Sequence, residues 1–123
     1  MFNNILLVFI GGGLGCVCRF LISKISLHYC NGSFPVGTFV SNVISCIILA
    51  LLVYFFSIRT DLSSKALYFL LITGFCGGLS TFSTFSFETF ELFKQGNPML
   101  ALLNIVLSIS VGLGAMYFLY KQN

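Results

Sequence analysis

Four long apolar stretches divide the sequence, and they cover residues 4–25, 34–56, 66–90 and 98–120. Each is close to the ~20 residues that an α-helix needs to cross the ~30 Å hydrocarbon core of a bilayer. Apolar residues follow one another without the alternation that transmembrane strands require, so a β-barrel is excluded. The pattern therefore predicts an all-α integral membrane protein, with four transmembrane helices in a single domain over residues 1–123.

The composition supports the same class of protein. Of the 123 residues, 58% are hydrophobic and 7% are charged, whereas soluble domains have about 25% charged residues. Mean hydropathy is +1.04. A soluble core of this length does not bury so much apolar surface, so we expect a multi-pass membrane protein without a soluble module or a nucleic-acid partner. The five cysteines include no C-x-x-C pair, and they indicate packing residues rather than a metal cluster.

The third apolar stretch contains a segment unlike a lipid-facing helix, and it reads Gly74-Phe75-Cys76-Gly77-Gly78-Leu79-Ser80-Thr81-Phe82-Ser83-Thr84-Phe85-Ser86. Each glycine costs a helix about 1 kcal/mol relative to alanine. Four of the seven residues that follow Gly78 have hydroxyls: Ser80, Thr81, Ser83 and Thr84. Irregular backbone at membrane depth must be buried in protein or line a wet cavity. We therefore expect the helix to be broken at Gly77–Ser80, beside a functional site. The alternative is a glycine hinge whose Ser and Thr side chains bond carbonyls one turn earlier.

A polar stripe runs along the second stretch, where Thr38, Asn42 and Ser45 share one helix face. Asn42 carries two N–H donors that lipid does not satisfy, so its amide is a candidate ligand for an anion. The alternative for Asn42 is an interhelical hydrogen bond that holds helices together. A similar stripe, with the spacing i, i+4, i+8, occurs in the fourth stretch at Asn104, Ser108 and Gly112.

Two phenylalanines, Phe82 and Phe85, lie three residues apart in the hydroxyl-rich segment, beside Ser83 and Thr84. They are either core packing or ligands, because the edge of an aromatic ring carries partial positive charge. Hydroxyl and amide donors dominate this region, and no acidic residue occurs in the third stretch before Glu88. A small, strongly hydrated anion fits this polarity better than a cation does.

The first stretch ends with Arg19, one turn after Gly15 in a glycine-rich segment that permits close helix contact. Its guanidinium either reaches the membrane surface along its apolar stem or is held by facing carbonyls at a vestibule, where it draws in anions. Arg19 is therefore a candidate residue of an anion entrance.

The positive charges do not favour one orientation in the membrane. Four spans place both termini and the second loop on one side, with Arg59, Lys65 and Lys121. The opposite side has Lys24, Lys94 and, depending on its depth, Arg19. This balance reflects either a small protein with few charges or dual topology, in which copies insert both ways and pair antiparallel. Four helices also enclose too little space for a pore, which favours an oligomer.

Three segments resemble the Fluc (CrcB) family of fluoride channels, and together they extend over most of the chain. They are Gly12-x-x-Gly15-x-x-x-Arg19-Phe20, then Phe34-Pro35-x-Gly37-Thr38-Phe39-x-x-Asn42, and finally the third-stretch segment from Gly74 to Phe85. The third is the most specific. Two departures occur: Ser80 replaces a threonine, and Ser45 replaces a glycine that follows the second motif in the family. Neither change removes a candidate pore donor.

The resemblance implies a function and an assembly. It implies an antiparallel, dual-topology homodimer in the cell membrane (the bacterial inner or plasma membrane), with two pores that export fluoride passively and so lower its toxicity. It also implies a structural sodium ion at the dimer centre, held by the backbone carbonyls of Gly77 and Ser80. The implied pore residues are Asn42, Phe82, Phe85, Ser83, Thr84 and Ser108, with Arg19 at the vestibule. Thr38, from the polar stripe on the second stretch, is a further candidate pore residue.

Two other functions are compatible with a small four-helix membrane protein. A proton-coupled, dual-topology exporter needs a carboxylate within the membrane, and the first, second and fourth stretches contain neither Asp nor Glu. A non-transporting accessory subunit would not need Asn42, Phe82 and Phe85 around a broken helix. An enzyme is not expected, because the sequence contains no nucleophile and base in a recognisable arrangement.

Overall fold

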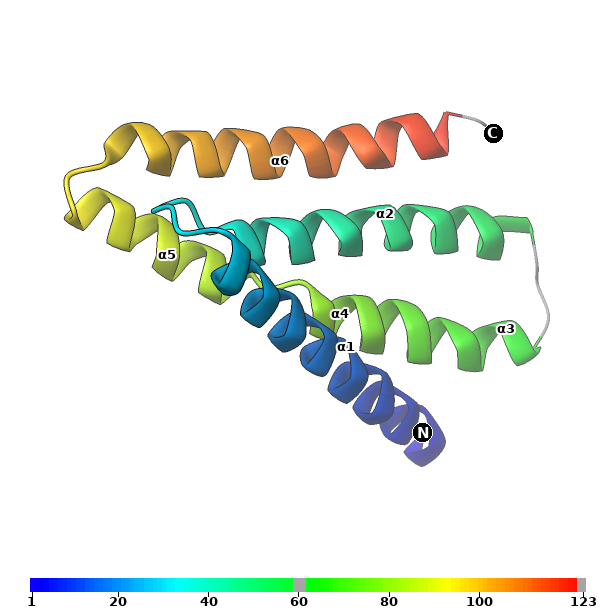
Figure 1. Cartoon of the computed structure of the whole chain (residues 1–123). Coiled ribbons are helices and arrows are strands. Elements are labelled where there is room, and N and C mark those ends of the chain that lie inside the picture. Colours follow the sequence, from blue (N-terminus) through cyan, green and yellow to red (C-terminus); the bar gives the residue numbers. More distant parts are fainter. Residues whose placement is uncertain (59–61, 122–123) are drawn as a thin grey trace.

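The computed structural model describes residues 1–58 and 62–121, and this part of the chain is helical with short connections (Figure 1). The elements are α1 (Phe2–Tyr29), α2 (Val36–Ile58), α3 (Leu62–Leu67), the π-helix η1 (Tyr68–Cys76), α4 (Gly77–Leu79), α5 (Phe82–Lys94) and α6 (Pro98–Tyr120). Arg59, which entered the charge comparison, lies outside the described residues.

Four spans in the described part of the chain are long and apolar enough to cross a membrane: Phe2–Tyr29, Val36–Ile58, Lys65–Lys94 and Pro98–Tyr120. The prediction of an all-helical, multi-pass membrane protein is therefore confirmed. Three of the spans extend beyond the apolar stretches by a few residues. Hydropathy marks the part of a helix that matches the hydrocarbon, whereas backbone hydrogen bonding continues until a residue such as Gly or Pro ends it.

The ends of the spans agree with up-and-down topology. In Figure 1 the N-terminus, the end of α2, the start of α3 and the end of α6 lie at one end of the molecule. The connection from α5 to α6 is a tight turn in which Gly96 adopts a positive φ of 81°, a conformation that favours glycine. The Asn97 N–H donates to the Leu92 carbonyl at 2.9 Å, and Pro98 then begins α6, where a missing donor costs nothing.

The third span contains two extended residues between α4 and α5. Ser80 has φ −81° and ψ 156°, and Thr81 has φ −151° and ψ 121°. The glycines indicated Gly77–Ser80 for the interruption, but Gly77–Leu79 continue as helix. Gly78 serves close packing against α1. The two residues that leave the helix both carry hydroxyls, and that of Thr81 accepts the Thr84 N–H.

Glycines allow α1 to cross η1 and α4 with the two backbones in contact. A Cβ at Gly15 would meet the Phe75 carbonyl oxygen and, at 2.7 Å, the Leu79 nitrogen. On the other side of the crossing, a Cβ at Gly78 would meet the carbonyl oxygen of Gly12. Close contact of this kind is how helices associate where no hydrophobic effect separates protein from lipid. The crossing therefore fixes α1 directly against the segment that precedes the extended residues.

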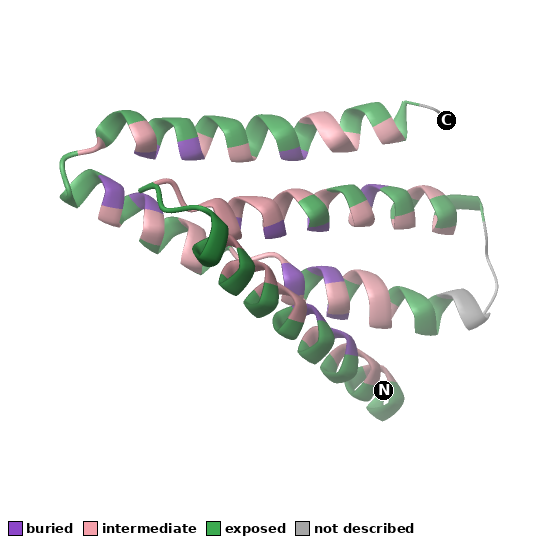
Figure 2. Cartoon of the chain, in the orientation of Figure 1, coloured by how far each residue is buried: buried purple, intermediate pink, exposed green. Residues whose placement is uncertain are grey.

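Buried residues lie on the sides of the helices that face one another (Figure 2). On α6 they are Ala101, Asn104 and Gly112, and the buried parts of the α6 ribbon in Figure 2 lie on its side toward α2 and α5. The outward sides are mainly exposed and rich in large apolar side chains. Lipid or another membrane helix covers such faces, so the small core is consistent with a membrane protein.

The close crossing predicts that Gly15→Ala destabilises the protein, while Gly13→Ala on the same helix does not. The new methyl group at position 15 overlaps backbone atoms of the third span, which cannot rotate away, whereas a Cβ at Gly13 meets nothing within 4 Å in the chain. Overpacking of this kind costs about 1–3 kcal/mol. Thermal unfolding of the detergent-purified variants measures the difference, and equal midpoints for the two would contradict the prediction.

Candidate functional site

The polar stripe on α2 contacts the third span at three successive levels. The Thr38 hydroxyl donates to the Glu88 carboxylate at 2.9 Å. Asn42 bonds the backbone of Thr81, and Ser45 donates to the carbonyl of Cys76 at 2.9 Å. All three side chains of the stripe are therefore hydrogen-bonded to the third span of the same chain.

Asn42 bonds both backbone groups of Thr81. The Thr81 N–H donates to Asn42 Oδ1 at 2.8 Å, and Asn42 Nδ2 donates to the Thr81 carbonyl at 3.3 Å. The amide side chain therefore acts as a substitute peptide group for an extended residue that has left the helix. Because an amide nitrogen has two hydrogens, one N–H of Asn42 is left for another acceptor.

The Thr81 hydroxyl organises the start of α5. It accepts a hydrogen bond from the Thr84 N–H at 3.3 Å, which makes Thr81 the N-cap of α5. The Thr84 hydroxyl lies 3.2 Å from the Thr81 hydroxyl, and the Ser83 hydroxyl lies 3.4 Å from it. Three hydroxyl groups thus gather at the N-terminal end of α5, where the helix dipole is positive.

These side-chain bonds release two backbone carbonyls. In a continuous α-helix the Thr81 N–H would donate to the Gly77 carbonyl, and the Thr84 N–H to that of Ser80. The first N–H instead bonds Asn42 and the second bonds the Thr81 hydroxyl. Carbonyl oxygens freed in this way are suitable ligands for a hard cation. Gly77 and Ser80 therefore have the chemistry that the implied sodium site requires.

A cavity of about 300 Å³ lies beside the extended residues, between α2, α5 and α6. It brings together four of the predicted pore residues with several neighbours, and its lining is Asn42, Cys46, Ser80, Thr81, Phe82, Phe85, Ser108 and Ile109. The Phe82 and Phe85 ring centroids are 6.2 Å apart. Ser83 and Thr84 do not line this cavity, and the Thr81 hydroxyl connects them to it. Amide, hydroxyl and aromatic groups therefore meet in one place.

Arg19 lies on the other side of the third span, apart from this cavity. Its Nε donates to the Gly78 carbonyl at 3.1 Å, and its Nη2 lies 3.6 Å from Cys16 Sγ. The guanidinium is held by a facing carbonyl, one of the two arrangements considered for this residue. The carbonyl that accepts from Arg19 belongs to Gly78, the residue after Gly77.

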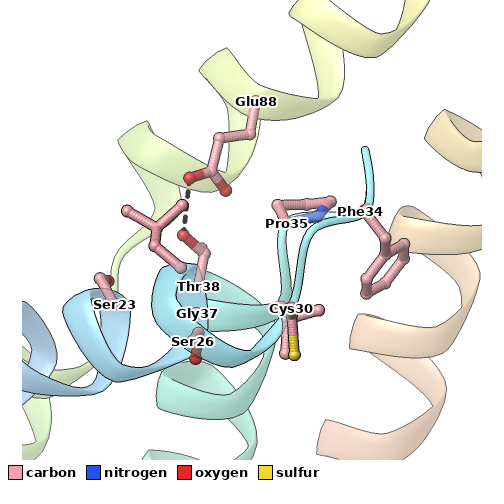
Figure 3. Close-up of a pocket in the computed structure, with 11 residues that line it drawn as sticks. Ser23, Ser26, Cys30, Phe34, Pro35, Gly37, Thr38 and Glu88 are labelled. Atoms are coloured by element: carbon pink, nitrogen blue, oxygen red, sulfur yellow. Dashed lines mark hydrogen bonds between the residues drawn. The ribbon is translucent and has the colours of Figure 1, made fainter.

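A second, smaller cavity of about 120 Å³ lies where α1 and α2 meet α5 (Figure 3). Thr38 and Glu88 line this cavity and point toward each other, and Ser23, Ser26 and Cys30 also line it. Glu88 Oε2 is buried and has no hydrogen-bond partner among the described residues. Thr38 therefore belongs to this cavity and not to the one around Asn42.

Glu88 and Thr81 are candidate site residues that the sequence did not identify. Glu88 is the one acidic residue within the four predicted apolar stretches, and a carboxylate at membrane depth is by itself a signal of function. Thr81 stood in the hydroxyl-rich segment without a distinct role. Its role depends on Asn42, which is 39 residues away in the sequence.

Polar contacts from α6 reach the backbone of Phe85. Asn104 Nδ2 donates to the Thr89 hydroxyl at 2.9 Å, and that hydroxyl donates to the Phe85 carbonyl at 2.7 Å. Ser108 lies one turn from Asn104 and donates to its Oδ1 at 3.4 Å. The polar side chains of α6 are thus linked through Thr89 to the backbone of Phe85 on α5.

Comparison with known proteins identifies relatives over nearly the whole chain. A family model described as "CrcB-like protein, Camphor Resistance (CrcB)" matches residues 6–119. A protein of Azobacteroides pseudotrichonymphae is 38% identical over 120 residues, which cover 98% of this chain and 95% of that protein. One of Pyrococcus abyssi is 47% identical over 106 residues, or 86% of this chain and 84% of the relative. One of Yersinia pestis is 42% identical over 125 residues, or 100% of this chain and 97% of the relative.

The first two relatives are named "Fluoride-specific ion channel FluC", and the third is named "Fluoride-specific ion channel FluC 1". The match to the family model leaves out only a few residues at each end of the chain. From these matches we conclude that the chain belongs to the CrcB family.

Proposed function

We propose that this protein is a fluoride-selective channel that lets fluoride leave the cell passively and thereby lowers cytoplasmic fluoride. The names of the relatives support a fluoride channel and not an enzyme. The observation that carries the proposal in this chain is the cavity in which the Asn42 amide, the Ser108 hydroxyl and the rings of Phe82 and Phe85 meet.

The cavity suits a dehydrated anion because its polar groups include donors without a fixed positive charge. One Asn42 N–H replaces part of the hydration shell, and the hydroxyls of Thr81 and Ser108 replace more of it when they rotate away from their present acceptors, Thr84 and Asn104. The edges of the Phe82 and Phe85 rings add partial positive charge. Weak binding at several groups lets the ion move on, whereas a lysine or arginine in the same place would retain it.

The proposed channel is an antiparallel, dual-topology homodimer with two pores. The Phe82 side chain is 81% exposed in the single chain, and Ser83, Ser86 and Gly77 are also exposed. Exposed hydroxyl groups are costly to place against hydrocarbon, where lipid offers them no hydrogen-bond partner. A second copy over this face completes the surroundings of Phe82 and supplies polar neighbours for the hydroxyls.

The dimer holds a structural sodium ion through the backbone carbonyls of Gly77 and Ser80 from both copies. This part of the proposal rests on the two carbonyls whose helical donors are bonded elsewhere. When bound, the ion neutralises the partial negative charge of carbonyl oxygens that face each other at the centre. It therefore joins the two copies without taking part in anion movement.

A polar route for the anion continues from the cavity toward Thr38 and Glu88. Along α2, Thr38 lies one turn from Asn42, and the second cavity opens beside it. A carboxylate repels an anion unless hydroxyl donors shield it, and the hydroxyl of Thr38 bonds Glu88. Arg19 provides positive charge on the other side of the third span and serves the vestibule.

Anion release from liposomes that contain the purified protein tests the proposal. With a potassium ionophore present, an ion-selective electrode should record rapid fluoride release and negligible chloride release, without any proton gradient. Fluoride release that appears only with a proton gradient would indicate a coupled exporter. No release of either anion from dimeric protein would contradict the channel and favour an accessory subunit.

Replacing Asn42 with alanine is expected to slow fluoride release by roughly tenfold to a hundredfold, the loss typical of removing one hydrogen bond to a charged group. The same liposome assay measures the rate, normalised to the amount of inserted dimer. Asn3→Ala, at an exposed position near the start of α1, is the matched control. Unchanged release by the Asn42 variant would refute its role in the pore.

Isoleucine at Phe82 or Phe85 keeps much of the apolar volume but removes the ring edge, so each variant should release fluoride several times more slowly. Phe90→Ile is the matched control, because Phe90 is an exposed residue of α5 that does not line the cavity. Size-exclusion chromatography should show dimers for all three. Normal fluoride release by both pore variants would exclude a role for the ring edges.

A further inference from the structure

We infer that Asn42 is a positioning residue for the cation site: by accepting the Thr81 N–H, it keeps the Gly77 carbonyl free for sodium. The inference rests on the proposed function and adds a physical connection between the anion cavity and the proposed sodium site. The same amide would then serve both, with its oxygen toward the backbone and one N–H toward the cavity.

The first step is a choice between two acceptors for one donor. The Thr81 N–H lies at membrane depth, where a backbone donor has to be bonded within the protein. Its helical acceptor is the Gly77 carbonyl, four residues earlier. The Asn42 oxygen takes the N–H instead, at 2.8 Å. Without that oxygen, the N–H has the Gly77 carbonyl as its nearest acceptor along the chain, and the released carbonyl is lost.

The second step is that the carbonyls on either side of Gly77 already accept hydrogen bonds within the chain. The Cys76 carbonyl accepts from the Ser80 N–H at 3.0 Å, from the Ser80 hydroxyl at 2.9 Å and from the Ser45 hydroxyl at 2.9 Å. The Gly78 carbonyl accepts from Arg19 at 3.1 Å. The Gly77 carbonyl lies between these two, and its helical donor, the Thr81 N–H, bonds the Asn42 side chain instead.

The third step concerns access to that carbonyl. Gly77 is exposed, and a Cβ built there would meet nothing within 4 Å. Gly78, the next residue, is packed against the backbone of α1. The surface at Gly77 is therefore open in the single chain, as a site shared with a second copy and a cation requires.

Aspartate at position 42 separates the two roles of the side chain. Its carboxylate keeps an oxygen that accepts the Thr81 N–H, but it has no N–H for the Thr81 carbonyl or for an anion. Asn42→Asp should therefore keep the cation site and lose fluoride conduction. Asn42→Ala removes the acceptor and should lose both.

The experiment measures thermal unfolding of the purified dimer in sodium chloride and in N-methylglucamine chloride at equal ionic strength. The wild-type protein should unfold at a higher temperature in sodium, since a ligand that binds the folded state stabilises it. Asn42→Ala should lose this difference or need sodium at a concentration on the order of tenfold higher, the factor set by one competing hydrogen bond. Asn42→Asp should retain the difference.

Ser45→Ala is the matched control, one turn away on the same face of α2. Its hydroxyl bonds the Cys76 carbonyl, which keeps both donors from Ser80. This variant should respond to sodium as the wild type does. A general loosening of the contact between α2 and the third span would instead weaken the sodium response of Ser45→Ala as well, and that result would overturn the inference.

The outcomes distinguish this inference from the proposed function. If Asn42→Ala responds to sodium as the wild type does, the inference is overturned. Loss of the sodium response in a folded Asn42→Asp variant would also overturn the inference, and this second measurement decides the question if Asn42→Ala does not fold. A wild-type protein without any sodium response would overturn it too. Fluoride release is measured on the same samples, so a channel that conducts without responding to sodium remains a channel.

Discussion

The need to bond every backbone N–H at membrane depth determines the structure of the site. Two residues, Ser80 and Thr81, leave the helix in the middle of a span where water does not replace the lost partners. Side chains from other parts of the chain provide them: Asn42 bonds the Thr81 backbone, and the Thr81 hydroxyl bonds the start of α5. The polar stripe on α2 is therefore first a structural requirement, and the cavity beside it follows from how that requirement is met.

The sequence was sufficient to predict the membrane class and the four spans, because continuous hydropathy over about 20 residues is a strong signal. It also identified the polar faces of α2 and α6 by their spacing. Its prediction of an interruption at Gly77–Ser80 included the extended Ser80 but also three residues that remain helical, and it left out the extended Thr81. Gly77 and Gly78 suggested flexibility, yet Gly78 packs against α1 as part of a helix. A glycine that permits close approach and one that ends a helix look the same in a sequence.

Pairings between distant residues account for the rest of what was not predicted. Asn42 was identified as a buried amide, but its partner Thr81 depends on how α2 aligns with the third span. Glu88 and Thr38 meet across a cavity formed by three helices (Figure 3). Composition and periodicity place residues on faces of helices, whereas the register between helices results from packing, as in the backbone contact between α1 and α4.

The polar chain from Asn104 through Thr89 to the Phe85 carbonyl has a consequence for how Phe85 moves. It holds the backbone of Phe85 at a distance set by α6, so the freedom left to the ring is rotation about its side-chain bonds. Such rotation takes place in picoseconds to nanoseconds for an accessible side chain, far faster than helix movement. In the proposed channel, the ring of Phe85 would therefore adjust to an ion while its backbone stays in place.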